Sequence, residues 1–153
     1  MTATGHAIVG AAIASKIPDP KIALPLIFLS HFLGDKLPHW DAMTSHHSKS
    51  KSQIIFQSAA DVILSYVLVF LIFIIYKNQN PVYIFLAAFI AQSPDWLELP
   101  HLFFPAYNFA PARLSYRVQS WFHDVWFDSR LAAPWGIATQ VVVCILFLYW
   151  SLI

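Results

Sequence analysis

One apolar stretch, residues 54–76, constrains the fold of this chain more than any other feature. Asp61 is the main interruption in these 23 residues, and about 20 apolar residues are enough for a helix to cross a bilayer. Hydrophobic residues make up 58% of the 153-residue chain and charged residues 11%, against about 45–50% and about 25% in average soluble domains. We therefore predict one integral membrane domain over residues 1–153, folded as an all-α, polytopic helical bundle.

The first segment, residues 4–15, predicts a short apolar helix with Thr4 as its N-cap. Its small residues favour close helix packing. It is shorter than a bilayer span requires, so it either crosses a thinned region or packs inside the bundle. The first 15 residues lack a basic start, and we expect no signal peptide.

The remaining segments bring the total to about four to five transmembrane or membrane-embedded helices. The further predicted helices cover residues 22–36, 81–97 and 134–153. Between the last two, residues 98–133 are rich in aromatic side chains, which collect at membrane surfaces. We expect an interfacial segment there, with a short helix near residues 115–128.

Metal-binding side chains are concentrated in residues 30–41. His31 and Asp35 are four residues apart, so on a helix their Cβ atoms lie about 5–6 Å apart on one face, as two ligands of one metal ion would. Gly34 leaves room beside them. A straight helix would separate His31 and His39 by about 12 Å, but Pro38 ends the helix. His39 can then fold back, so that Asp35 bridges two ions, one held by His31 and the other by His39.

Other candidates come from distant segments, and each has a structural alternative. His6 is a metal ligand or a capped interfacial residue, and Asp95 is a ligand or a loop cap. His123 is a ligand or a polar position on an interfacial helix. The predicted metal ligands are therefore His6, His31, Asp35, His39, Asp95 and His123.

Four further residues are candidates for catalysis and substrate binding. Asp41 is a ligand, a general base or the residue that orients His39, and Asp61, inside a predicted membrane helix, is a ligand or a partner of one. Arg113 and Arg117 are four residues apart and either grip a phosphate or pair with lipid headgroups. We predict catalytic roles for Asp41 and Asp61 and substrate binding for Arg113 and Arg117.

The order of the helices predicts a polar asymmetry. Because consecutive helices alternate in direction, all seven histidines lie on one side if residues 4–15 also cross. The basic residues on that side are Lys36, Lys49, Lys51, Arg113, Arg117 and Arg130, and those on the other side are Lys16, Lys21 and Lys77. The positive-inside rule therefore predicts a cytoplasmic location for the histidine-rich face.

The residue types point to hydrolysis. Imidazole and carboxylate ligands without a cysteine cluster suit zinc, or alternatively manganese, as one or two ions. Such an ion leaves a position for water, lowers its pKa and stabilises charge on a phosphoryl oxygen. A site at headgroup level predicts an amphiphilic, phospholipid-like phosphoester as substrate and the lipid bilayer as partner. The net charge of +1 indicates no nucleic-acid partner, and the lone Cys144 excludes an internal disulfide.

Two families share these motifs. Thr4-Gly5-His6, the 31–41 stretch and Pro94-Asp95 resemble the small, membrane-bound, metal-dependent hydrolases of bacteria, which implies a bacterial inner-membrane protein. The stretch His31-Phe-Leu-Gly-Asp35 with Pro38-His39 also resembles the zinc motif of the zinc-dependent phospholipases C, with a shorter spacing to the last histidine. That resemblance implies that His31, Asp35 and His39 bind zinc and that Asp35 bridges two ions.

Two other functions fit the same residues. The histidines and aspartates could relay protons or divalent metal in a transporter, or hold a metal that only stabilises a non-catalytic membrane protein. A transporter needs a polar path across the membrane, and outside the histidine-rich side we expect the predicted spans to offer only Ser and Thr. We therefore favour a metal-dependent phosphohydrolase.

Overall fold

A computed structural model describes residues 1–44, 48–103, 109–124 and 131–153. In these ranges the chain forms helices and no strand, which confirms the all-α prediction. The helices are α1 (Ala3–Lys16), α2 (Pro20–Lys36), α3 (Lys51–Val69) with its π-helical continuation η2 (Phe70–Tyr76), α4 (Pro81–Phe103), α5 (Ala110–Asp124) and α6 (Trp135–Leu152).

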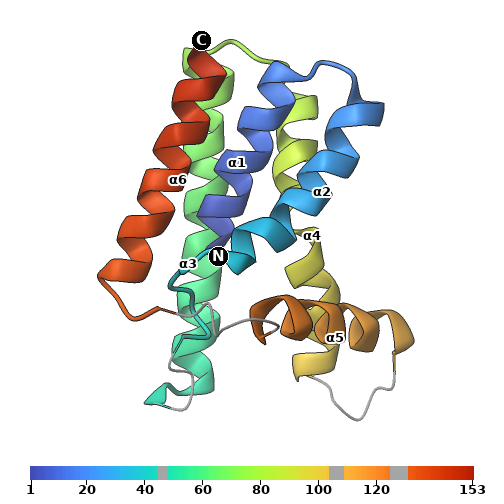
Figure 1. Ribbon diagram of the computed structural model, residues 1–153, viewed down its shortest axis with the longest axis vertical. Helices are drawn as coiled ribbons and strands as arrows, with labels where there is room; N and C mark the ends of the chain where they lie inside the picture. Colours follow the sequence, from blue (N-terminus) through green and yellow to red (C-terminus); the bar gives the residue numbers. More distant parts are fainter. Residues whose placement is uncertain (45–47, 104–108, 125–130) are drawn as a thin grey trace.

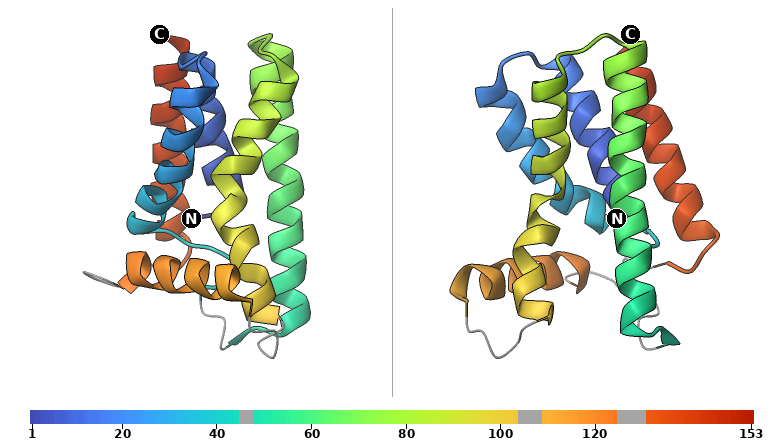
Figure 2. Two further views of the ribbon diagram at one scale, coloured as in Figure 1. Left: turned by 90° about the vertical axis from the view of Figure 1, so that its right-hand side faces the viewer. Right: turned by 180° about the vertical axis from the view of Figure 1, so that it is seen from behind.

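The short helix α1 is the centre of the bundle. It contacts α2, α3, α4 and α6, which surround it in Figures 1 and 2, and ten of its 14 residues are buried. Gly10 lets α1 approach α4 closely, since a Cβ added there would lie 2.7 Å from Ala91 Cβ and 3.1 Å from the Ala87 carbonyl oxygen. Of the two arrangements predicted for this helix, the structure has the packed one, built on small residues as membrane helix contacts commonly are.

In the part of the chain that the structure describes, two helices are long and apolar enough to cross a bilayer, judged by length and composition. One is α3 with η2, 26 residues from Lys51 to Tyr76, and the other is α6, 18 residues from Trp135 to Leu152. Their outward surface is strongly apolar: Phe56 is 74% exposed, Ile63 66% and Leu146 61%. Since water is a poor solvent for such a surface, its location outside the bundle agrees with a lipid environment.

Two predicted helix boundaries were wrong. The N-cap of α1 is Thr2, not Thr4, because the Thr2 side chain accepts a hydrogen bond from the Gly5 amide. Helix α4 does not end at residue 97, just after Pro94, but continues to Phe103. Pro94 has no N–H and cannot donate to the carbonyl of Ile90, but the Ser93 hydroxyl donates to that oxygen at 2.8 Å, so the carbonyl still has a donor where the helix passes through the proline.

The remaining helices lie close to the predicted ranges. The caps of α2 and α3 are Asp19 and Ser50. Helix α5 begins at Ala110, five residues before the predicted start at 115, and is described to Asp124. The predicted extension to 128 falls outside the described residues.

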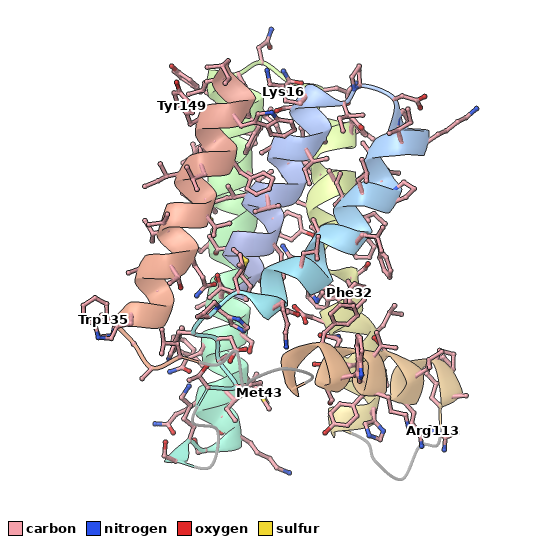
Figure 3. The ribbon with its side chains drawn as sticks, in the orientation of Figure 1. Lys16, Phe32, Met43, Arg113, Trp135 and Tyr149 are labelled. Atoms are coloured by element: carbon pink, nitrogen blue, oxygen red, sulfur yellow. The ribbon has the colours of Figure 1, made fainter. Side chains whose placement is uncertain are left out.

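The two ends of the bundle differ, as the helix order predicts. The C-terminal end of α2 and the beginnings of α3 and α6 lie toward the end of the molecule that α5 crosses (Figure 1). Figure 3 places Met43 and Arg113 toward this end and Lys16 at the opposite one. At that opposite end the Lys77 ammonium donates to the carbonyl oxygen of Ser151.

Candidate metal centre

Two histidines from different helices meet at the α5 end of the bundle. His6 lies in the second turn of α1 and His31 near the end of α2, and they are 3% and 0% exposed. Their rings stack with centroids 4.0 Å apart and planes 19° from parallel. Gly34 makes this possible, because a Cβ added there would lie 3.3 Å from Cε1 of His6. The space expected beside Gly34 is therefore occupied by the His6 ring.

Asp35 joins both imidazoles. Its Oδ1 lies 3.0 Å from Nε2 of His6, and its Oδ2 lies 3.1 Å from Nε2 of His31. The amino group of Met1 also contacts Oδ1. Asp35 is 2% exposed, and its four-residue spacing from His31 gives the side-by-side arrangement that the sequence predicts. Its two oxygens thus face two imidazoles, those of His6 and His31, and Asp35 bridges the two rings.

Asp95 brings a second carboxylate from α4. Its Oδ1 lies 3.5 Å from Nε2 of His31, and the ligand atoms of His6, His31 and Asp95 all lie within 4.8 Å of one another. Ligand atoms of a tetrahedral ion with bonds near 2.1 Å are about 3.4 Å apart. The three residues are therefore close enough to hold one metal ion.

The hydrogen-bond partners of His31 require either a proton or a metal ion at its Nε2. Nδ1 of His31 lies 2.8 Å from the carbonyl oxygen of Ala91 and must donate to it. Nε2 then faces only oxygen atoms: those of Asp35, of Asp95, and Oε1 of Gln119 at 3.5 Å. A bare nitrogen lone pair among these oxygens is repelled, so either a proton or a metal ion must lie between them. Donation of the other ring nitrogen to a backbone carbonyl is common among metal-binding histidines.

His39 and Asp41 form a separate pair. Nδ1 of His39 donates to the Leu37 carbonyl oxygen at 2.8 Å, and Nε2 lies 3.3 Å from Oδ2 of Asp41. The other oxygen of Asp41 accepts from the Thr44 amide at 2.6 Å. Burial raises the pKa of Asp41, but the hydrogen bonds from His39 and Thr44 outweigh it and hold that pKa below its ordinary value. The pair lies outside the group of His6, His31 and Asp95.

Asp61, predicted to be catalytic, caps the beginning of α1. Its carboxylate accepts hydrogen bonds from the amides of Ala3 at 2.6 Å and Thr4 at 3.3 Å, and from the Thr4 hydroxyl at 2.6 Å. A carboxylate at the N-terminus of a helix satisfies amides that have no partner within the helix. Asp61 therefore positions the helix that carries His6.

The predicted residues of α5 lie across the end of the bundle. Arg113 is half-buried and Arg117 is exposed, both on α5. His123 also lies in α5, but its side chain is outside what the structure describes.

One residue near the histidines escaped the sequence analysis. Gln119 of α5 is 3% exposed and approaches His31 through Oε1. Its spacing from Ala112 and Ser115 places the three on one face of a helix, and Ala112 is fully buried. This periodicity was the available signal, although it does not indicate which residues the face would meet.

Searches against protein-family models, curated proteins and solved structures find no match for this chain.

Proposed function

We propose that this protein is a membrane-embedded, metal-dependent hydrolase that cleaves a phosphoester with metal-activated water. The proposal rests on one observation, the group of His6, His31 and Asp95, in which both histidines are buried and the buried Asp35 lies against both imidazoles, while the Asp95 side chain is 41% exposed. Buried charged groups are costly unless they are paired or bind a cation. Three helices contribute to this group, and in a membrane protein such residues usually serve function.

The donor set favours zinc, with manganese as the alternative, because it combines imidazoles with carboxylates and has no thiolate. Three protein ligands leave a position for water, and the ion would lower the pKa of that water and polarise a phosphoryl oxygen. In the hydrolysis, the water oxygen bonds to phosphorus, the ester P–O bond breaks, and the departing alcohol takes up a proton.

The chain's own residues supply the orientation. His31 is held by the Ala91 carbonyl, so that its Nε2 is directed at Asp35 and Asp95. Asp35 faces both imidazoles and is the candidate for a bridging ligand, or for the group that accepts a proton from the attacking water. Asp61 fixes the beginning of α1 and hence the location of His6.

A lipid-like substrate follows from the surroundings of this group. We propose that α1 packs inside a polytopic bundle of four to five membrane helices in the cytoplasmic membrane, with the α5 end on the cytoplasmic side. The exposed Trp121 on α5 and Trp135 at the start of α6 support a location at headgroup level. Lys36, Lys49 and Arg117 belong to the same end, in agreement with the positive-inside rule.

The test compares two aspartate-to-asparagine variants of the detergent-purified protein. Asp95→Asn should lose bound zinc or manganese in elemental analysis, and hydrolysis of bis(4-nitrophenyl) phosphate should fall by about 100-fold or more. Asp19→Asn is the matched control. Asp19 caps the N-terminal end of α2, far from His31 at the other end of the same helix, and Asn caps a helix equally well. Wild-type protein that holds no transition metal, or that loses no turnover on Asp95→Asn, would contradict the proposal.

One observation favours the transporter instead. Gln92 is 1% exposed and donates from Nε2 to the Ser65 hydroxyl at 2.9 Å, while its Oε1 has no partner among the described residues. Gln92 follows Ala91, whose carbonyl binds His31, so polar groups continue from the histidines into the bundle. Zinc uptake into reconstituted vesicles without phosphodiester turnover would support transport. A metal that raises the unfolding temperature, with neither uptake nor turnover, would indicate a purely structural ion.

A further inference from the structure

Helix α5 closes the end of the bundle at which the histidines meet. It packs against α4 and α2 and runs across the bundle axis (Figure 2). Its hydrogen bonds to the bundle in the described part of the chain include one from the Ser115 hydroxyl to the Pro94 carbonyl at 3.1 Å and one from the Lys36 ammonium to the Phe122 carbonyl at 2.9 Å. Gln119 lies between these attachments and faces inward.

The carboxamide of Gln119 has only one of its two ends occupied. Oε1 lies 3.5 Å from Nε2 of His31, whereas the amide nitrogen, Nε2, is buried and has no hydrogen-bond partner among the described residues. Buried donors almost always have a partner, because an unmade bond costs the desolvation of the group. An unpaired N–H donor next to a group of metal ligands therefore indicates that an acceptor binds there.

We infer that Gln119 binds the substrate, with its amide Nε2 donating to a non-bridging oxygen of a phosphoryl group at the His6–His31–Asp95 centre. This inference rests on the proposed function. Asp35 and Asp95 accept hydrogen bonds and cannot donate to such an oxygen when ionised. Gln119 supplies a neutral donor on the α5 side, opposite the helices that carry the ligands. The ligand class is a phosphate ester, with inorganic phosphate as its simplest representative.

The experiment measures phosphate binding and metal binding separately. Full-length protein in detergent is loaded with Mn²⁺, and the affinity for inorganic phosphate is measured by ³¹P line broadening. Gln119→Met removes the donor but keeps an unbranched side chain of similar length, and Ser115→Ala, one turn away, is the control that weakens only the attachment of α5. Phosphate affinity should fall by about tenfold or more in Gln119→Met, as for one lost hydrogen bond to a charged group. Mn²⁺ affinity should stay within about twofold, and Ser115→Ala should bind phosphate as the wild type does.

Several results would overturn the inference. Unchanged phosphate affinity in Gln119→Met would do so, as would an equal loss in Ser115→Ala, and loss of Mn²⁺ from Gln119→Met would make Oε1 a metal ligand instead. If Gln119→Met does not fold, Gln119→Asn, which shortens the amide by one methylene, must show the same selective loss. Wild-type protein that binds Mn²⁺ and phosphate but hydrolyses no phosphodiester would contradict the proposed function alone. A wild type that binds no metal would contradict both.

Discussion

Two histidine–aspartate pairs lie within residues 31–41, and the structure places them in different surroundings. His31 and His39 are both fully buried, and each donates from Nδ1 to a backbone carbonyl at 2.8 Å. Among the described residues, Nε2 of His39 meets a carboxylate within its own turn, whereas Nε2 of His31 meets oxygen atoms from α2, α4 and α5 and its ring stacks on that of His6.

The number of carboxylates around Nε2 is the property that distinguishes an ion pair from a candidate metal centre. One carboxylate facing one imidazole is satisfied by a single proton shared between them. Two carboxylates that converge from separate helices, as Asp35 and Asp95 do at His31, repel each other, and a divalent cation compensates that repulsion better than one proton does. The number of helices that contribute oxygen atoms, rather than the motif itself, is therefore the reason why we propose His31, and not His39, as a metal ligand.

The largest expected effect is a difference in metal affinity between variants of His31 and of His39. His31→Ala should lower zinc or manganese affinity by about 100-fold or more, because it removes a ligand that three other side chains face, while His39→Ala should leave the metal content unchanged. Elemental analysis and metal titration of the purified variants measure this, with thermal unfolding as the check that each folds. Equal loss of metal in both variants would restore the pairing predicted from sequence, in which His31 and His39 serve two ions bridged by Asp35.

The second prediction concerns stability without metal. Asp41→Ala should destabilise the protein by about 1–2 kcal/mol, because Thr44 loses the acceptor of its amide and hydroxyl. In a chain of this size that corresponds to about 2–8 °C in the midpoint of thermal unfolding. Metal content should not change. A variant that keeps the wild-type midpoint but loses metal would reverse the roles assigned to the two pairs.

The third prediction uses the lowered pKa of Asp41. Since the folded-state pKa lies below the unfolded value of about 3.9, its stabilisation is complete above pH 4 and is lost as the pH falls further toward the folded-state pKa. The difference in unfolding midpoint between wild type and Asp41→Asn should be constant from pH 7 to 5 and shrink below pH 4. Shrinkage that begins above pH 5, or none by pH 3, would contradict this assignment.

Sequence reasoning predicted those parts of the fold that depend on local spacing. The helices, the His31–Asp35 pair and the packing of small residues in α1 follow from periodicity and residue size. The alternating directions of consecutive helices, visible in Figure 1, were also predicted from their order. Each of these features needs only neighbouring residues, or the simplest rule for connecting helices.

The rest depends on tertiary contacts that spacing does not encode. His6 rather than His39 faces the second oxygen of Asp35, because α1 lies in the centre of the bundle. Asp61 binds the start of α1, which a carboxylate inside an apolar run does not reveal. Helix α4 continues through Pro94, where the Ser93 hydroxyl donates to the carbonyl oxygen of Ile90. The contact of Gln119 with His31 requires knowing where α5 lies.

The smallest expected effect concerns the close contact between Gly34 and the ring of His6. Gly34→Ala adds a Cβ at 3.3 Å from Cε1 of His6 and 3.1 Å from Sδ of Met1. The flexible Met1 side chain can move, but the His6 ring is stacked on His31 and held by Asp35, so a displacement of a few tenths of an ångström must alter the metal geometry. Metal affinity should fall by about threefold to tenfold, while stability changes by less than about 1 kcal/mol, because alanine favours the helix over glycine. Metal titration alongside thermal unfolding measures both, and an unchanged metal affinity would mean that His6 is not a ligand.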